Sequence, residues 1–550
     1  MMPVSPPRNP DPAPKLSTWA VVAAVLCGVA PFWSVLVAHS WHGRHGPSGF
    51  IVYDMAYYVA NGREIFERGN GIGYCNPYDP SPDAPVIYYH WLPWLFGFGV
   101  KILHLDPGVW FTAIGIAAGI VCGWGTFRLV AAVLPTRRCL VPLFLLVMWG
   151  GGLFTVAALI AELMATGSMM ADVRRFDPFN GWWFLNWGRN LVYPTEAVYH
   201  ALVAWAWVGV VRRRPAAAAA PIMALAATHP FSGLQHLAIM LAWFSAAAVV
   251  PSLWPPASEE SPPAHLRHVR IWWAALAAAT VAFVAYYFVL LPAVPQHAAI
   301  SRKWALDWVL SPAAMLLAYT PVACLAAARV VRDRLHWRPE MTFFLLAAGV
   351  SLALVKHDLF VTPRQPLHFT RGYVWLPLML LGLPLVQSLA VALLRRTGTI
   401  VGPLLIVLAA VPAALDNAGW LTTYCRTEGH DVRVADADRE AFAALEQLGC
   451  RGVLLYAVPD RLVGNYLSAT YTSVRPFVGH LHLTPQYDDR LAAVQEWIAS
   501  GRFAGLLDEV EILVLDRLTA YPLDHDAWET LCETPHRTVL RRRPVRPKPD

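Results

Sequence analysis

Apolar runs about twenty residues long recur along most of this chain, and each is long enough to cross the hydrocarbon core of a bilayer as a helix. Hydrophobic residues make up 56% of the 550 residues and charged residues only 15%, whereas soluble domains carry roughly 25% charged residues. The sequence therefore predicts a polytopic α-helical membrane protein. About eleven spans are expected, near residues 17–38, 107–133, 139–164, 196–211, 216–230, 233–253, 270–291, 308–330, 340–356, 373–394 and 399–416.

Basic residues gather in alternate short loops between these runs. Positive charge stays on the cytoplasmic side of a membrane, so the N-terminus is expected inside and the C-terminus outside. The basic clusters are Arg137/Arg138, Arg212–Arg214, Arg267/Arg270, Arg329/Arg332/Arg334 and Arg395/Arg396.

The part of the chain after Asp416 has an ordinary soluble composition. Strand-like runs at 452–458 and 510–516 alternate with a helical pattern at 487–500, which is typical of a small α/β domain. The predicted organisation is a disordered cytoplasmic tail at 1–16, a transmembrane domain at 17–416, an extracytoplasmic α/β domain at 417–540 and a disordered tail at 541–550.

The loops expected on the outer face are polar and aromatic, which is costly beside lipid. They cover 39–106, 165–195, 292–307 and 357–372. Ionisable groups at membrane depth are rare and usually mark a functional site, so we expect these loops to converge on one. Asp54 is the leading catalytic candidate, although its position also allows it to cap a helix expected at 55–68.

The first outer loop combines an early acidic residue with alanine, isoleucine and glycine at regular spacing, followed by a stretch rich in proline and tyrosine. This pattern resembles the GT-C superfamily of integral-membrane glycosyltransferases, and in particular bacterial members of the dolichyl-phosphate-mannose mannosyltransferase type. The residues that carry the resemblance are Asp54, Tyr57, Tyr58, Ala60, Arg63, Glu64, Ile65, Gly69, Tyr74, Asn76, Pro77, Tyr78, Tyr88, His229, Pro230, Phe231, Gly479, His480 and Thr484, with the helix expected at 490–498.

The resemblance implies a GT-C-like helical fold in the bacterial cytoplasmic (inner) membrane. It also implies a polyprenyl-phosphate-linked sugar as donor and a glycan, lipid or protein of the cell envelope as acceptor, with no nucleic-acid partner. A lipid-carried donor fits a site on the outer face, because nucleotide sugars are cytoplasmic. The chain departs from the commonest family pattern, since Met55 and not a second acidic residue follows Asp54. A second carboxylate would have to come from Glu64, Asp172 or Asp177.

Sugar transfer to a hydroxyl group needs a base and a cation for the departing phosphate. We expect Asp54 to act as the base of a direct, inverting transfer. Guanidinium groups bind phosphate oxygens in pairs, and Arg371 with Arg364 is the preferred pair because they flank an aromatic-histidine loop. The other candidates for the lipid phosphate are Arg189, Arg302 and Lys303, and the candidates for acceptor binding are Tyr57, Tyr58, His90 and Glu64.

The residue pattern leaves metal and redox chemistry open. His480 and His482 lack further ligands at a recognisable spacing, so no metal site is expected, and the need for a divalent cation is undecided. A disulfide among the cysteines of the expected outer regions is equally undecided, because four cysteines allow three connectivities. These cysteines are Cys75, Cys425, Cys450 and Cys532.

Two other functions compete with the enzyme. A transporter or flippase of a lipid-linked saccharide would show paired halves with polar residues near the midplane. Here no repeat is seen, and the ionisable residues gather at one face. A non-catalytic envelope assembly protein would tolerate the loss of Asp54, which separates it from a glycosyltransferase.

Overall fold

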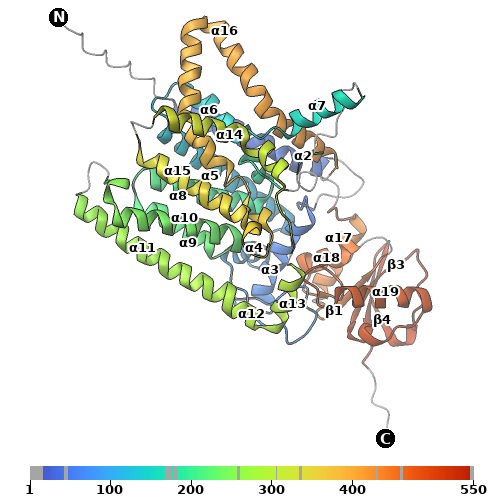
Figure 1. Cartoon of the computed structure of the whole chain (residues 1–550). Coiled ribbons are helices and arrows are strands. Elements are labelled where there is room, and N and C mark those ends of the chain that lie inside the picture. The colour runs from blue at the N-terminus through green and yellow to red at the C-terminus, as the bar shows by residue number, and fades with distance from the viewer. Residues whose placement is uncertain are drawn as a thin grey trace, which may run out of the picture.

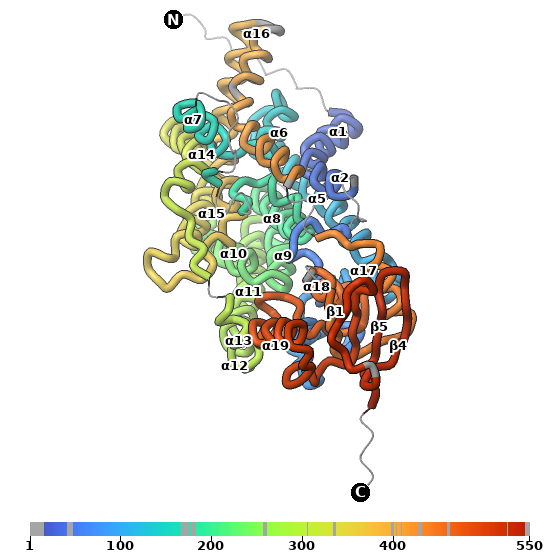
Figure 2. Tube along the Cα trace, turned by 90° about the vertical axis from the view of Figure 1, so that its right-hand side faces the viewer, coloured from blue at the N-terminus to red at the C-terminus, as the bar shows by residue number. Residues whose placement is uncertain are grey.

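The computed structural model combines a helical body with a small C-terminal sheet domain. It describes residues 16–41, 48–166, 175–177, 183–256, 261–304, 306–333, 337–427, 432–458 and 462–544. The sheet domain lies at one end of the body, and the N-terminal segment lies at the other (Figures 1 and 2). Most of the predicted tails at 1–16 and 541–550 lies outside the described residues.

Helices account for almost all of the body. In chain order they are α1 Thr18–Val29, α2 Ser34–Trp41, α3 Ala56–Glu67, α4 Trp91–Lys101, α5 Pro107–Val133, α6 Leu140–Trp149, α7 Phe154–Thr166, α8 Pro194–Val211, α9 Pro215–Ala226, α10 Pro230–Val249, α11 Pro262–Val284, α12 Leu291–Ala293, α13 Pro295–Lys303, α14 Pro312–Arg332, α15 Pro339–Val355 and α16 Trp375–Thr427. Proline opens α5, α8–α11, α14 and α15, because its fixed φ and missing N–H suit the first helical position.

Short 3₁₀ turns and one π-helical segment connect or interrupt these helices. The 3₁₀ turns are η1 Ala30–Trp33, η2 Tyr53–Met55, η4 Gly188–Val192, η5 Pro251–Leu253, η7 His357–Leu359 and η8 Pro366–Phe369, and the π segment is η6 Ala285–Leu290.

Six helices among the described residues are long and apolar enough to cross a membrane, judged by length and composition. They lie at Thr18–Ser40, Pro107–Val133, Pro230–Val249, Pro262–Ala293, Pro312–Arg332 and Trp375–Thr397. α6 and α7 together would make a seventh span, but they are bent by 64°. The chain is thus a polytopic helical protein, as predicted.

The expected count of about eleven spans is larger than this number for identifiable reasons. α9 has 12 residues and α15 has 17, so neither reaches full span length. The last two expected runs both fall within α16, a helix of 53 residues that Figure 1 shows bending sharply back on itself. The run at 139–164 breaks between α6 and α7, where the carboxylate of Asp416 accepts hydrogen bonds from the backbone N–H groups of Gly152 (3.0 Å) and Thr155 (3.2 Å).

The C-terminal domain is built on one five-stranded sheet. Its elements are α17 Asp436–Gln447, β1 Val453–Ala457, α18 Leu462–Tyr471, β2 Arg475–Pro476, α19 Tyr487–Ser500, η10 Gly505–Glu509, β3 Ile512–Asp516, η11 His525–Ala527, β4 Trp528–Glu533 and β5 Arg537–Arg542. The strand order is β2-β1-β3-β5-β4. β1 is parallel to β2 and β3, whereas β5 is antiparallel to β3 and β4. The predicted strands at 452–458 and 510–516 and the helix at 487–500 are confirmed.

The two faces of this sheet pack into different cores. Side chains alternate across a strand, so Leu454 and Tyr456 of β1 join the core that continues into the helical body. Leu455 lies on the opposite face and packs in a second core with Trp497 of α19. One face of the domain is therefore continuous with the body.

The first outer loop and α3 form the surface on which the C-terminal domain sits. The Tyr466 hydroxyl of α18 accepts a hydrogen bond from the backbone N–H of Tyr57 (3.0 Å) and donates one to the carbonyl of Tyr53. The amide of Asn76 donates to the carbonyl of Leu483 (2.7 Å). These bonds are buried or partly buried, so the domain holds the segment around Asp54 in a defined position.

Candidate functional site

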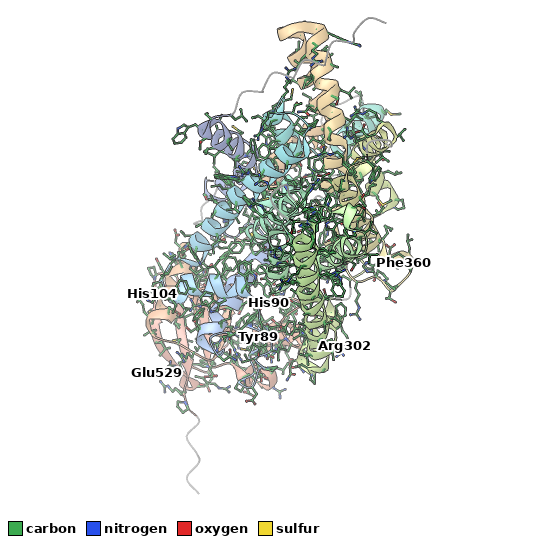
Figure 3. The ribbon with its side chains drawn as sticks, turned by 90° about the vertical axis from the view of Figure 1, so that its left-hand side faces the viewer. Tyr89, His90, His104, Arg302, Phe360 and Glu529 are labelled. Atoms are coloured by element: carbon green, nitrogen blue, oxygen red, sulfur yellow. The ribbon has the colours of Figure 1, made fainter. Side chains whose placement is uncertain are left out.

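The expected outer loops meet at one end of the helical body. Tyr88 of the first loop lies 3.1 Å from a ring nitrogen of His297 on α13. Trp183 contacts His368, with ring centroids 4.7 Å apart, and the side-chain amide of Gln365 donates to the carbonyl of Trp304 at 2.6 Å. Figure 3 shows Tyr89, His90 and Arg302 in the lower part of the view, on the same side as the C-terminal domain that carries Glu529. These contacts join all four predicted segments, as expected.

Asp54 lies in the 3₁₀ turn η2, directly before α3. Its side chain is 58% exposed, and Oδ1 lies 3.3 Å from Nε2 of His480 in the C-terminal domain. The alternative role as a helix cap is wrong, because α3 begins after Met55 and has no side-chain cap. Asp54 is therefore oriented by a contact with a distant part of the chain and is left accessible on its other side.

His480 is almost wholly buried, with 1% of its side chain exposed. Its ring lies among tyrosines from both parts of the molecule, with centroid distances of 5.0 Å to Tyr53, 5.5 Å to Tyr78 and 5.7 Å to Tyr466. Trp304, which follows α13, lies 6.3 Å from His480 and 4.6 Å from His482. This contact could not be predicted from the residue pattern, because His480 and Asp54 are 426 positions apart.

Arg371 is a predicted phosphate-binding residue that is largely buried and shares its electrostatic surroundings with Asp54. Its guanidinium forms an ion pair with Glu196 in the first turn of α8, and Nη2 lies 2.7 Å from Nδ1 of His368. The backbone has a φ of 24°, an uncommon value for a non-glycine residue, and its carbonyl lies 2.8 Å from Nε2 of His200. Burial lowers the pKa of Arg371. The surrounding structure thus holds this residue in an unusual conformation.

Tyr58 and His368 show that Asp54 and Arg371 belong to one electrostatic environment. Burial raises the pKa of Tyr58, while the charge of Arg371 lowers it and that of Asp54 raises it. Burial also lowers the pKa of His368 to about 3, and Asp54 opposes that shift. His368 is therefore neutral near pH 7. Among the described residues its Nε2 is buried and has no hydrogen-bond partner.

The remaining predicted cations occupy other surroundings. Arg189 is 1% exposed and forms ion pairs with Asp177 (3.0 Å) and Asp416 (2.9 Å). Its Nε donates to Asn417 at 2.7 Å, so its guanidinium is occupied by protein groups and its position favours a structural role. Arg302, Lys303 and Arg364 are exposed. Arg364 therefore does not pair with the deeply placed Arg371 in the way the sequence analysis preferred.

The predicted acceptor-binding residues also separate into two groups. Tyr57 and Tyr58 are partly exposed on the first turn of α3, next to Asp54. His90 lies between the hydroxyl groups of Tyr74 (2.7 Å) and Tyr287 (2.8 Å), and burial lowers the pKa of His90 to about 4. His90 is thus a neutral link between the first loop and η6.

Glu64 is not placed to meet an acceptor. It is 3% exposed and contacts Arg68, Arg475 (3.6 Å) and the thiol of Cys75 (3.1 Å). Glu64 and Asp177 instead pair with arginines, Asp177 with Arg189 at 3.0 Å, and Asp172 lies outside the described residues. The neighbour of the Asp54 carboxylate is therefore a histidine.

Metal and disulfide chemistry find little support in the described part of the chain. It contains no group of three or more histidine, cysteine, aspartate or glutamate residues that could hold a metal ion. All eight cysteines are free, so the four expected in outer regions are not bridged.

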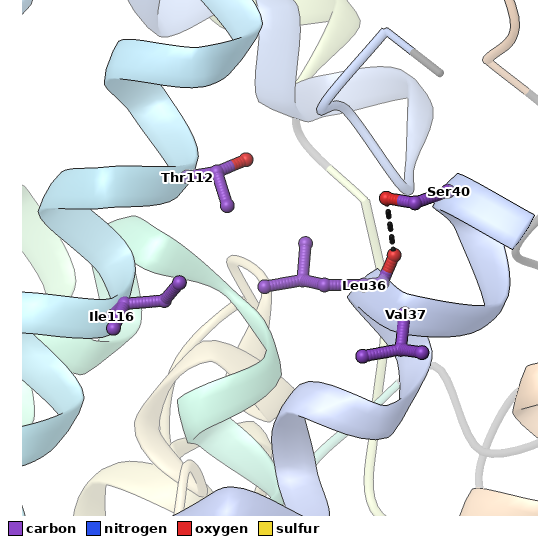
Figure 4. Close-up of a pocket in the computed structure, with 5 residues that line it drawn as sticks. All are labelled: Leu36, Val37, Ser40, Thr112 and Ile116. Carbon is purple, nitrogen blue, oxygen red and sulfur yellow. Dashed lines mark hydrogen bonds between the residues drawn. The ribbon is translucent and has the colours of Figure 1, made fainter. Parts of the chain in front are cut away.

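Two hollows lie outside the Asp54 region. One, of about 520 Å³, lies between α2 and α5 and is lined by Leu36, Val37, Ser40, Thr112 and Ile116 (Figure 4). It has no ionisable lining residue. The other, of about 550 Å³, separates the first loop from the C-terminal domain. Its arginines are matched by acidic residues, as in the 2.9 Å pair of Arg490 with Glu509. Neither hollow is lined by Asp54 or Arg371.

No protein-family model matches this sequence, and no curated protein matches it.

Proposed function

We propose that this protein is an integral-membrane glycosyltransferase of the GT-C type, which moves a sugar from a polyprenyl-phosphate donor to a cell-envelope acceptor. The observation that carries the proposal is that an accessible carboxylate, Asp54, and a largely buried guanidinium, Arg371, both act electrostatically on Tyr58, with the neutral His368 beside Arg371. Both lie where four loops of a polytopic helical body meet. An exposed base and an enclosed cation are the two groups that transfer from a phosphate requires.

The reaction needs the base and the leaving group on opposite sides of the sugar. The acceptor oxygen bonds to the anomeric carbon as the bond from that carbon to the phosphate oxygen breaks, and the stereochemistry inverts. The acceptor proton passes to Asp54, whose Oδ2 has no hydrogen-bond partner among the described residues, whereas Oδ1 faces His480. General-base help of this kind contributes typically 10²–10⁴-fold to the rate.

The departing phosphate needs donors that are fixed before the reaction begins. Arg371 supplies a guanidinium, and the neutral His368 supplies an Nε2–H that has no protein partner among the described residues. His368 can hold this proton on Nε2 because its Nδ1 faces Nη2 of Arg371 at 2.7 Å. Lys303 adds positive charge on the side of His482, where its proximity lowers the pKa of that histidine in addition to burial.

The helical body suits a donor that stays in the bilayer. The long helix at Pro262–Ala293 has an apolar window that is only 17% buried inside the protein, so it offers most of its surface to lipid. In this proposal the body completes a GT-C-like arrangement of about eleven spans, with the N-terminus in the cytoplasm. The sheet domain then lies outside the bacterial inner membrane and contributes to the acceptor side.

A transfer assay with purified, full-length protein tests this function. The donors are a panel of polyprenyl-phosphate hexoses, and the acceptors are octyl glycosides and an envelope lipid extract. The wild type is expected to transfer sugar from at least one donor, and Asp54→Asn is expected to lower the rate by about 10²–10⁴-fold. Asp307→Asn, which changes an exposed carboxylate in a neighbouring segment, serves as the matched control and should retain activity.

Two results would contradict the proposal. Full activity in Asp54→Asn would remove the base assignment. The absence of transfer by the wild type with every donor would favour the transporter or assembly protein instead.

A further inference from the structure

His480 has a defined hydrogen-bonding direction on each of its two ring nitrogens. The backbone N–H of His482 donates to Nδ1 at 3.2 Å, so Nδ1 carries a lone pair and not a proton. The ring proton therefore sits on Nε2, which faces Oδ1 of Asp54 at 3.3 Å. The bond of one imidazole nitrogen fixes the tautomer at the other, and here it makes His480 a donor to the carboxylate.

The loop that carries His480 is itself fixed from several sides. The hydroxyl of Thr484 accepts hydrogen bonds from the backbone N–H groups of Gly479 (3.2 Å) and His480 (3.0 Å). The hydroxyl of Tyr53 accepts from the N–H of Leu481 at 3.2 Å. With only 1% of its side chain exposed, His480 has little freedom to rotate away from Asp54.

Asp54, the partner of the buried His480, is exposed. A buried, rigid donor that holds one oxygen of an accessible carboxylate leaves the second oxygen directed toward solvent. A contact of 3.3 Å is at the long end of hydrogen-bond geometry, as is common for catalytic contacts before substrate binds. The arrangement restricts the carboxylate without enclosing it.

We propose that His480 is a positioning residue for Asp54, so that the C-terminal domain completes the active site. Through its Nε2–H it holds Oδ1 and presents Oδ2 to the acceptor hydroxyl. This inference rests on the proposed function for its catalytic meaning, but the interaction itself does not depend on any sugar.

A thiol placed at position 54 tests the interaction without substrate. Asp54→Cys is alkylated with iodoacetamide, and the modified peptide is followed by mass spectrometry in three backgrounds: wild-type His480, His480→Leu and His480→Gln. A neighbouring donor stabilises the thiolate and speeds alkylation. His480→Leu is expected to slow the reaction about tenfold, and His480→Gln, which keeps a donor, to recover most of that loss. Equal rates in the three backgrounds would overturn the proposal.

The transfer assay then tests the catalytic role with Asp54 intact. His480→Leu should lower kcat by about 10–100-fold, the range of one hydrogen bond to a charged group, while KM for the polyprenyl-phosphate hexose changes by less than about threefold. His480→Gln should restore kcat to within about fivefold of wild type. A parallel loss in both variants, or an unchanged kcat in His480→Leu, would contradict a positioning role.

Control variants separate this role from folding and from the proposed function. His536→Leu replaces an exposed histidine of the same domain and should leave kcat and the alkylation rate unchanged. Thermal unfolding of each variant reports any loss of stability. If the wild type transfers no sugar, the proposed function fails, and the alkylation series still decides whether His480 acts on position 54.

Discussion

Two buried arginines in the expected outer loops have opposite surroundings. Arg189 meets two carboxylates, an asparagine and the ring of Trp420, whose centroid lies 5.2 Å from its guanidinium carbon. Arg371 meets one carboxylate and a histidine, and shares its surroundings with the exposed Asp54. The guanidinium of Arg189 is held by protein groups on each of its nitrogens, whereas the Nε2 of His368 beside Arg371 is buried and has no hydrogen-bond partner among the described residues. We take this unmatched nitrogen, more than the arginine itself, as the feature that favours ligand binding beside Arg371.

The largest effect on stability is expected at the cluster formed by Arg189, Asp177 and Asp416. Arg189→Leu removes the guanidinium that pairs with the buried Asp177 and Asp416, and removing one partner of a buried ion pair costs about 3–5 kcal/mol. Thermal unfolding in detergent should show the loss. Arg175→Leu, in the same loop, removes an exposed arginine 4.0 Å from Glu162 and should change stability by less than about 1 kcal/mol. Equal stability of the two variants would contradict the distinction.

Substitution of the ion pair between Arg371 and Glu196 should instead lower the activity with little loss of stability. Arg371→Gln combined with Glu196→Gln removes both members of the pair, so no buried charge is left alone. We expect the transfer rate to fall about 10–100-fold, the value of one or two hydrogen bonds to phosphate, with KM for the donor rising. If the double variant loses stability but its folded fraction transfers sugar at the wild-type rate, Arg371 has a structural role and the prediction is wrong.

Acid should destabilise the contact between the first loop and η6. Burial lowers the pKa of His90 to about 4, so the unfolded chain, with an ordinary histidine pKa near 6.5, binds the proton more readily than the folded chain. Stability is therefore present above about pH 6.5 and falls as the pH drops toward 4. Thermal unfolding across this range measures the effect, and His90→Phe should flatten the profile. If the stability of His90→Phe depends on pH as strongly as that of the wild type, other titratable groups set the pH dependence and this prediction is wrong.

The smallest effect is expected at Arg364. This residue is exposed, and its backbone N–H contacts His357 at 2.9 Å. Arg364→Gln should alter stability by less than about 0.5 kcal/mol, and the transfer rate should change far less than in the Arg371 double variant. If Arg364→Gln lowers the transfer rate as much as the Arg371 double variant does, Arg364 and Arg371 act as a pair, as the sequence analysis preferred.

Local pattern predicted the features that depend on neighbouring residues. The strands around Val453–Ala457 and Ile512–Asp516 were recognisable because each is a short apolar run between turns. Asp54 was singled out because ionisable groups at membrane depth are costly and rare, and its catalytic role stays a prediction. The expected count of about eleven spans stays a prediction, because hydropathy does not show where a helix bends, as the chain does between α6 and α7.

Features that depend on distant partners could not be read from the sequence. Arg189 and Arg371 look alike in their loops, and only the fold brings Asp416 to one and Glu196 to the other. His480 suggested a weak metal motif, yet its position beside Asp54 follows from the packing of the sheet domain on α3.

The most direct test of the central claim is the position of a bound donor. Cryo-electron microscopy of the wild type with a non-hydrolysable polyprenyl-phosphonate hexose should place the phosphonate against Arg371 and His368, with the anomeric carbon facing Asp54. Density for the ligand at the apolar hollow between α2 and α5, or at any place where Asp54 and Arg371 do not flank the sugar, would contradict the account.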